Sequence, residues 1–291
     1  VARGDRFLRP EKNTFSLIRH TAEITVESLV DEIAVHLGAA REQSRFLAEA
    51  IGRGDIDIAD RSKLIHAMFG SLAAAPQVGG IAFFSVDGWS QRVGRSADGI
   101  VELFQEAEAN LVIDRLVKDM RDRSSPYWGG IFWADSLDEP YLTVSSAVFR
   151  DGNYLGVVSS IVSVQVLSHY VDDFQLQTGL HAFVLYGSRH VLAHPAMTTA
   201  IASLGPDKPL PRLDEVGDPY LAELWAEDRE ALGLLEGASS SLLGHMRNLD
   251  DDQVYYFYRV VGGYGPQQFY IGLYALASET DGAEFDRLFL R

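Results

Sequence analysis

The chain has 291 residues, which suits two domains better than one, since most domains hold about 100 to 150 residues. Its 47% hydrophobic and 23% charged residues indicate a folded protein, and its net charge of −16 gives no electrostatic support for binding nucleic acid or an anionic membrane surface. The absence of cysteine excludes disulfides, cysteine-ligated metals and thiol catalysis.

The chain begins Val-Ala-Arg, with neither a methionine nor a signal peptide, so we expect it to be a fragment of a longer protein. Between residues 14 and 52, apolar residues recur every three or four positions without a proline. This spacing predicts one amphipathic helix about 60 Å long, which would run past more than one module. A second helix is predicted at 61–74, after possible N-caps at Asp57 and Asp60.

Strand patterns follow, and Asp87-Gly88 marks a hairpin turn between the first two. Helical spacing then predicts a helix from Ile100 to about Met120. A proline- and glycine-marked loop (124–130) leads to three strands at 131–134, 141–149 and 154–164. The apolar stretch 154–167 is interrupted by serines and falls short of the roughly 20 residues that a membrane-spanning helix needs.

The same order repeats in a shorter form in the second half of the chain. The predicted elements there are a helix at 167–176, strands at 181–186 and 189–194, a helical patch at 219–235, and a closing hairpin of 254–261 and 269–274. Each half is a small antiparallel sheet with helices to one side, an α+β pattern. We therefore expect three parts: a long N-terminal helix (1–54), one PAS-like module (55–170) and a second such module (171–291).

Two segments carry a family resemblance. The run 141–158, ending in Tyr-Leu-Gly-Val-Val, and the run 184–195, Val-Leu-Tyr-Gly-Ser-Arg-His-Val-Leu-Ala-His-Pro, resemble the double Cache family of tandem PAS-like sensors. The resemblance implies the periplasmic region of a bacterial inner-membrane receptor, tethered by flanking transmembrane helices that are absent from this fragment. It also implies a homodimer through the N-terminal helix, and a cytoplasmic output domain such as a nucleotide cyclase or a histidine kinase.

The resemblance further implies a small-molecule ligand in the membrane-distal module, 55–170. Members that bind amino acids carry an Arg-x-Trp-Tyr run and, after the Gly-Val-Val strand, an aspartate. Here Arg123 is followed by Ser-Ser-Pro-Tyr-Trp, and Ile161 stands where the aspartate would fall. Without that carboxylate nothing obvious holds an ammonium group, so we expect the ligand not to be a free amino acid.

Aromatic and polar residues gather around the loop and strands that wall the pocket in PAS-like folds. As ligand-binding residues we predict Arg123, Tyr127, Trp128, Phe132, Trp133, Tyr141, Ser145 and Ser159. We expect the two tryptophans to border the ligand. The alternative is that these side chains fill the core of their own module. The chain would then recognise a protein partner or serve as a dimerisation spacer, with no small-molecule ligand.

Catalytic signatures are missing from the sequence: it has no Gly-x-Ser-x-Gly, glycine-rich phosphate loop or His-Glu-x-x-His. We expect no enzyme activity, cofactor or metal in this fragment. Convergence of His181, His190 and His194 as metal ligands is not expected, because the last two would lie about 13 Å apart on one strand. The acidic runs 135–139 and 250–252 are interpreted as solvated turns rather than calcium loops.

Overall fold

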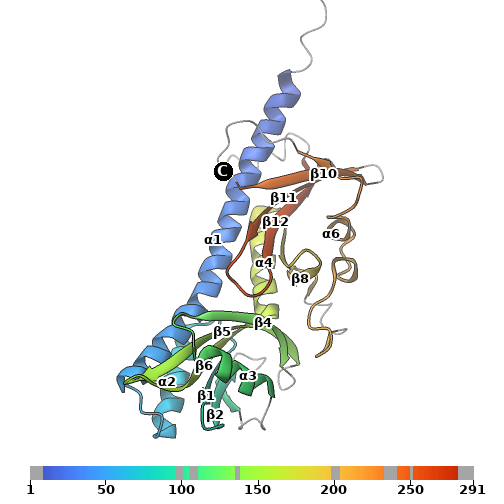
Figure 1. Ribbon diagram of the computed structural model, residues 1–291. Helices are drawn as coiled ribbons and strands as arrows, with labels where there is room; N and C mark the ends of the chain where they lie inside the picture. The colour runs from blue at the N-terminus through green and yellow to red at the C-terminus, as the bar shows by residue number, and fades with distance from the viewer. Residues whose placement is uncertain are drawn as a thin grey trace, which may run out of the picture.

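The protein consists of a long helix lying beside two antiparallel sheets, as Figure 1 shows. The computed structural model describes residues 9–95, 101–104, 111–134, 138–197, 204–232, 241–249 and 252–280, with the backbone alone for 9–19, 101–104 and 280. Helix α1 (Arg9–Arg53) has 45 residues. The prediction of one continuous helix over 14–52 is confirmed, and this helix passes both sheets.

The distal module is built on a six-stranded sheet in the order β3-β2-β1-β6-β5-β4, with all neighbours antiparallel. Its elements are α2 (Arg61–Ala74), β1 (Gly80–Ser85), β2 (Ser90–Arg95), β3 (Val101–Phe104), α3 (Leu111–Met120), β4 (Tyr127–Ala134), β5 (Glu139–Arg150) and β6 (Asn153–Ser163). Helix α2 has the predicted bounds, and Asp60 caps it by accepting a hydrogen bond from Lys63 N–H (3.1 Å).

One predicted element of this module is wrong. The expected helix from Ile100 to Met120 is a short strand, β3, followed by the ten-residue helix α3. Strand β3 pairs with β2 at the edge of the sheet, from Arg92–Phe104 to Arg95–Val101. Pairing with a neighbouring strand has decided the structure of a segment whose apolar spacing fits either element.

The second module, called the proximal module below, repeats this arrangement in a sheet of order β8-β7-β12-β11-β10-β9. Its elements are α4 (Val164–Thr178), β7 (His181–Tyr186), β8 (His190–Ala193), η2 (Leu213–Glu215), α6 (Pro219–Ala222), β9 (Glu230–Ala231), β10 (Leu243–Leu249), β11 (Asp252–Val261), β12 (Phe269–Leu276) and η3 (Ala277–Thr280). The predicted helical patch 219–235 is reduced to the four residues of α6, and β10 was not predicted. The expected boundary at residue 170 falls inside α4, which connects the two sheets.

Helix α1 contributes to the core of both modules. Along one stripe Leu29, Ile33 and Leu37 are fully buried, and the stripe continues to Leu47 and Ile51. The C-terminal half of α1 packs against β5 and β6, whereas its N-terminal half packs against β11 and β12. The same apolar stripe therefore joins the two sheets.

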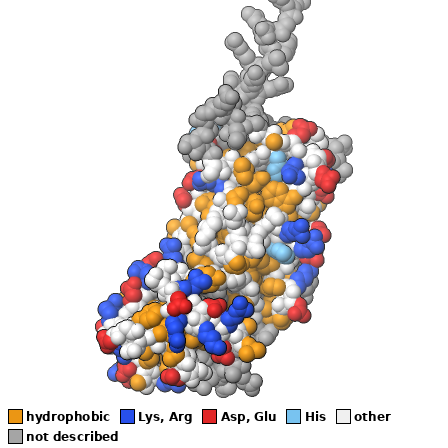
Figure 2. Space-filling model, viewed as in Figure 1, with side chains coloured by type: hydrophobic (Ala, Val, Ile, Leu, Met, Phe, Trp, Pro, Cys, Tyr) orange, Lys and Arg blue, Asp and Glu red, His pale blue; other side chains and the backbone are white. Residues whose placement is uncertain are grey.

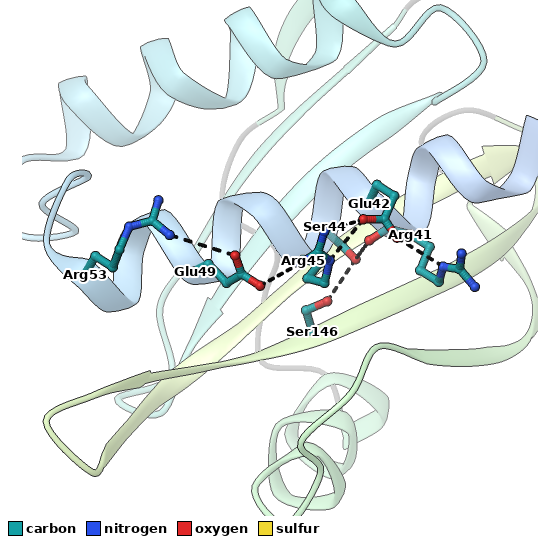
Figure 3. A network of polar contacts seen from close by, with 7 residues as sticks. All are labelled: Arg41, Glu42, Ser44, Arg45, Glu49, Arg53 and Ser146. Carbon is teal, nitrogen blue, oxygen red and sulfur yellow. Dashed lines mark hydrogen bonds and ion pairs between the residues drawn. The ribbon is translucent and has the colours of Figure 1, made fainter.

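The outer side of α1 faces solvent and carries ion pairs as well as exposed apolar residues such as Val35 and Phe46. Arg45 pairs with Glu42 and with Glu49 (2.5 and 2.9 Å), and Arg53 extends the chain of ion pairs at 3.8 Å from Glu49, as Figure 3 shows. Each exposed pair contributes little to the stability of the protein, because water and salt screen the charges. Within the described ranges, no helix is both long and apolar enough to cross a membrane.

A buried carboxylate organises the proximal module. Asp218 Oδ1 accepts hydrogen bonds from the N–H groups of Tyr220 and Leu221 and so caps α6. Its Oδ2 accepts a hydrogen bond from the Tyr274 hydroxyl (2.5 Å) and lies 3.2 Å from His194 Nε2, an electrostatic contact. Burial acts to raise the pKa of Asp218, but these contacts offset it and hold the pKa at about 2.

We predict that truncating the buried stripe of α1 destabilises the protein. Leu37→Ala should lower the free energy of unfolding by about 2 to 5 kcal/mol, because Leu37 is fully buried and the change leaves a cavity. The same substitution at Leu176, which is 76% exposed on α4, should change it by less than about 0.5 kcal/mol. Urea unfolding followed by circular dichroism measures both, and equal effects would contradict the assignment of the buried side of α1.

A second prediction concerns acid stability. The pKa of Asp218 is about 2 in the folded protein, below its ordinary value of 3.8. The carboxylate therefore contributes its stability above about pH 4, and this contribution, on the order of 2 kcal/mol, is lost as the pH falls toward 2. Asp218→Asn should remove this part of the acid dependence in urea unfolding measured between pH 2 and 6, and an unchanged dependence would show that Asp218 has no such role.

Candidate ligand-binding site

The two faces of the distal sheet have different neighbours. Because side chains alternate along a strand, adjacent residues of β5 point to opposite faces. Ser146 points to α1, where its hydroxyl lies 2.9 Å from that of Ser44 (Figure 3). Ser145 points the other way, and its hydroxyl lies 2.7 Å from that of Ser159 on β6.

Helix α3 lies over this second face. Tyr154 pairs with Phe149 beside a bulge in the β5–β6 hairpin, and both rings lie on the same side of the sheet as Ser145. The Tyr154 hydroxyl donates a hydrogen bond to the carbonyl of Val117 in α3 (2.6 Å). We call this side of the distal sheet the α3 face. It is toward the viewer in Figures 1 and 2, and in Figure 2 Lys and Arg side chains gather over the distal module.

A row of five residues, three of them with small side chains, crosses the middle of the α3 face. Through consecutive pairings the row runs over five strands: Tyr127, Ser145, Ser159, Ala82 and Arg92. Five strands at about 4.8 Å spacing place the two ends about 19 Å apart. The two serines and the alanine form a floor of small side chains between the larger Tyr127 and Arg92.

Arg92 stands at one end of this row and was not predicted as a site residue. Its guanidinium lies 5.2 Å from the centre of the Phe84 ring, and its buried Nε has no hydrogen-bond partner. Burial lowers the pKa of Arg92, and no carboxylate of the described residues compensates for that burial. A half-buried cation without a partner is costly in a folded protein and is typical of a site that binds an anion.

The other end of the row carries a second arginine. Arg123 stacks on the Tyr127 ring, with its guanidinium carbon 3.8 Å from the ring centre. Arg123 is exposed and Tyr127 is partly buried. The stacking brings together two of the predicted site residues and leaves the Arg123 donors directed at solvent or ligand.

Six residues from Ser145 along β5, about 20 Å from the row, lies a carboxylate that the sequence analysis had assigned to a solvated turn. Glu139 opens β5, and its oxygens accept hydrogen bonds from the hydroxyls of Tyr141 and Ser163. Burial and this neighbouring carboxylate raise the pKa of Tyr141, whose ring lies 5.9 Å from that of Phe132. Because side chains alternate along a strand, Glu139 lies on the same face as Tyr141, which is the α3 face. This alternation is the signal in the sequence from which Glu139 could have been placed there.

Six of the eight predicted site residues therefore share the α3 face, and two do not. Trp128 pairs with Val144 and Trp133 pairs with Pro140, both of which lie on the α1 side with Ser146. This register separates the two tryptophans from the other six predicted residues, and the expectation that they border the ligand stays a prediction. The physical reason for the separation is the bulge at residues 129–130, which, with alternation, turns Trp128 and Trp133 away from Tyr127 and Phe132.

Trp128 instead contacts the proximal module. Its ring meets that of Tyr264 edge-on, with centroids 5.6 Å apart, and Tyr264 in turn stacks on Phe269 of β12. A Cβ added to Gly265 would lie 2.8 Å from the carbonyl oxygen of Gly129, so the backbone of this loop packs directly on β4. Strand β4 thus presents one face to the candidate site and the other to the second module.

The proximal module has a pocket of its own, with a volume of about 320 Å³. It is lined by Glu227, Arg229, Ala231, Leu243, His245 and Tyr258. The buried His245 already donates a hydrogen bond from Nε2 to the carbonyl of Leu224 (2.7 Å), and its ring stacks on Tyr256. Because this buried imidazole is already paired, the pocket offers a ligand less than the α3 face does.

The three histidines considered as metal ligands have separate environments. His181 stacks on Tyr274 with centroids 4.6 Å apart, His194 contacts Asp218, and His190 is exposed at the start of β8. In the part of the chain that the structure describes, no three His, Asp or Glu side chains are grouped so as to hold a metal ion.

Comparisons with known proteins identify the fold. No family model and no curated protein matches the sequence. Among solved structures, a protein described as methyl-accepting chemotaxis protein X is 12% identical with a TM-score of 0.60, covering 91% of this chain and 99% of its own. The extracellular domain of the putative histidine kinase vpHK1S-Z8 is 10% identical with a TM-score of 0.59, covering 96% and 98%.

A third neighbour corrects one of our expectations. The ligand-binding domain of the Pseudomonas fluorescens chemoreceptor CtaA, in complex with L-isoleucine, is 15% identical with a TM-score of 0.57, covering 94% of this chain and 98% of its own. The same domain is also solved with L-alanine. This fold therefore accommodates free amino acids, and the expectation that the ligand is not a free amino acid is wrong.

These neighbours are sensory and ligand-binding domains rather than enzymes, as expected for this chain. Their likeness extends over nearly the whole of both chains and includes the long helix and both sheets. The chain has the tandem PAS-like fold of the ligand-binding domains of bacterial chemoreceptors and histidine kinases, as its resemblance to the double Cache family predicted.

Proposed function

We propose that the chain is the extracytoplasmic sensor region of a membrane receptor and that its distal module binds a small carboxylate-bearing ligand on the α3 face. The observation that carries this proposal is Arg92, a half-buried guanidinium that pairs with no carboxylate among the residues the structure describes, at the end of a floor of small side chains. A guanidinium donates two parallel hydrogen bonds to a carboxylate, a geometry that lysine does not provide.

A free amino acid or a related compound carries such a carboxylate. Arg92 would hold it, and the neighbouring small residues Ala82 and Ser159 would lie under the rest of the molecule. Tyr127 lies about 19 Å from Arg92 across the strands, and Glu139 lies six residues or about 20 Å from Ser145 along β5, so neither shares a ligand of amino-acid size with Arg92. The neighbours solved with amino acids support this class of ligand, without fixing which member this chain binds.

Signal output is proposed from the fold. Since the neighbours belong to chemoreceptors and a histidine kinase, we propose that the chain stands outside the membrane and reports to a cytoplasmic domain. A nucleotide cyclase as that domain remains a prediction from the family resemblance alone. A ligand shifts such a receptor only through a difference in its affinity for two states, so the site must contact an element that moves. Strand β4 is that element, because Trp128 on its far face contacts Tyr264 of the proximal module.

One observation favours a different function. Ser145 and Ser159 are 2% and 3% exposed and satisfy each other with a hydrogen bond, as they would in a filled core. A chain whose α3 face is closed in this way would recognise a protein partner or space two other domains. The Arg92 experiment below separates the two functions.

We predict that Arg92→Gln weakens ligand binding at least tenfold, equivalent to about 1.4 kcal/mol, because the carboxylate loses its charged donor. The probes are the twenty common amino acids and short-chain carboxylates, screened by thermal shift and then titrated by calorimetry. Arg115→Gln is the matched control, since Arg115 is exposed on α3 and pairs with Asp119 at 3.7 Å. If both variants bind the ligand with an affinity within twofold of the native protein, the site does not include Arg92. If the native protein binds none of the probes, the partner-recognition function is favoured.

We also predict that Tyr264→Ala uncouples the modules. In the native protein, ligand binding should slow hydrogen exchange both on β5 and at residues 262–272. In the variant, protection on β5 should remain and protection at 262–272 should fall, because the edge-on contact with Trp128 is gone. Val260→Ala, an exposed position of the same module, is the control. Full retention of protection at 262–272 in Tyr264→Ala would show that coupling runs by another route.

A further inference from the structure

Two charged side chains line the pocket of the proximal module, and among the described residues neither pairs with an opposite charge. The pocket is an open cleft of about 320 Å³, lined by β9, β10, β11 and the segment just before β9. Glu227 and Arg229 stand on that segment, two residues apart. The carboxylate between them, Asp228, pairs with Arg247 instead (2.7 Å). The cleft therefore holds one positive and one negative group, both without a counter-charge.

The backbone fixes the position of the Arg229 guanidinium. Its Nη1 donates hydrogen bonds to the carbonyls of Trp225 (3.2 Å) and Ala226 (2.9 Å). A guanidinium has five N–H donors, so those of Nε and Nη2 remain available. Because Arg229 is exposed, a ligand in the cleft can reach them. An arginine fixed in this way loses less side-chain entropy on binding a carboxylate than a freely rotating one would.

The other groups that line the cleft are uncharged at pH 7. Burial raises the pKa of Tyr258, and no described residue forms a hydrogen bond with its hydroxyl. Burial is the main cause that lowers the pKa of His245, and the charge of Arg229 lowers it further, as expected for two groups that line the same cleft. The half-buried Tyr258 ring and the exposed Leu243 side chain supply apolar surface.

The two charges restrict what the cleft can bind. An anion alone would meet the uncompensated Glu227 carboxylate, and a cation alone would meet the Arg229 guanidinium. A ligand that carries both charges satisfies both side chains at once. Its carboxylate can accept two parallel hydrogen bonds from a guanidinium, and its ammonium group can donate to a carboxylate.

We propose that this cleft is a second ligand site, which takes a small zwitterion with a carboxylate, an ammonium group and an apolar or aromatic body. The carboxylate pairs with Arg229, the ammonium group pairs with Glu227, and the body lies against Tyr258 and Leu243. This site shares no residue with the α3 face, so it is independent of the function proposed above.

The test uses three probes that share a phenyl ring: L-phenylalanine, 3-phenylpropionate and 2-phenylethylamine. They are titrated into the whole chain while the NMR signals of the Gly244 amide and the Leu243 methyl groups are followed. Phenylalanine should bind about tenfold more tightly than either singly charged probe, because it alone satisfies both side chains. A singly charged probe that binds as tightly as phenylalanine would overturn the inference, as would no shift of either signal at millimolar phenylalanine.

Three variants assign the contacts. Arg229→Gln should weaken phenylalanine binding about tenfold and leave 2-phenylethylamine within about twofold, because only the carboxylate loses its partner. Glu227→Gln should weaken phenylalanine similarly and leave 3-phenylpropionate within about twofold. Arg212→Gln is the matched control, since Arg212 is exposed, belongs to the same module and pairs with Asp214 at 3.7 Å. If Arg229→Gln or Glu227→Gln weakens all three probes equally, or leaves phenylalanine unaffected, the paired recognition of two charges is wrong.

Arg92→Gln separates this site from the α3 face. It should leave the phenylalanine-induced shifts of Gly244 and Leu243 unchanged, because both residues belong to β10 of the other module. Loss of these shifts in Arg92→Gln would show that they report binding on the α3 face, and would overturn the second site. Conversely, shifts that depend on Arg229 and Glu227 but not on Arg92 support the second site whether or not the α3 face binds a ligand.

Discussion

The buried stripe of α1 is the constraint on which the rest of the structure depends. Val26 near one end of the stripe packs with β12, and Leu47 and Ile51 near the other belong to the distal core. Neither sheet can leave the helix without returning this apolar surface to water. The α1 side of the distal sheet therefore packs against the helix, and the α3 face is the side where we place the candidate ligand site.

Much of this fold follows from periodicity in the sequence. The regular spacing of apolar residues identified α1 and α2, and turn residues such as Asp87-Gly88 identified the hairpins. Local pattern failed where pairing between strands decided the outcome. Val101–Phe104 is a strand because it completes the edge beside β2, and β10 is a strand although Leu243–Leu249 has few β-branched residues.

The candidate site was less predictable than the fold, because a strand's pattern does not say which of its faces meets which helix. The sequence placed aromatic residues on β4 correctly, but the bulge at 129–130 separates Tyr127 and Phe132 from Trp128 and Trp133. Arg92 escaped notice because it lies far along the chain from the aromatic segment, whereas Glu139, two residues before Tyr141, was interpreted as part of a solvated turn. The sheet brings Arg92 into the row of Ser145 through three intervening pairings, which no local motif encodes.

The polar bonds beneath α1 limit how this helix can move. Ser44 contacts Ser146, and Gln43 accepts a hydrogen bond from Ser160 at 2.9 Å, both within an otherwise apolar interface. A shift of a helix by one residue along its axis is about 1.5 Å. Such a shift would break both hydrogen bonds and leave their polar atoms buried without partners. The C-terminal half of α1 and the distal sheet therefore translate as a single rigid body. Any piston or rotation of the helix must be accommodated at its other half, where Val26 and Leu29 pack on apolar neighbours and Glu27 forms an exposed ion pair with Arg259 of β11.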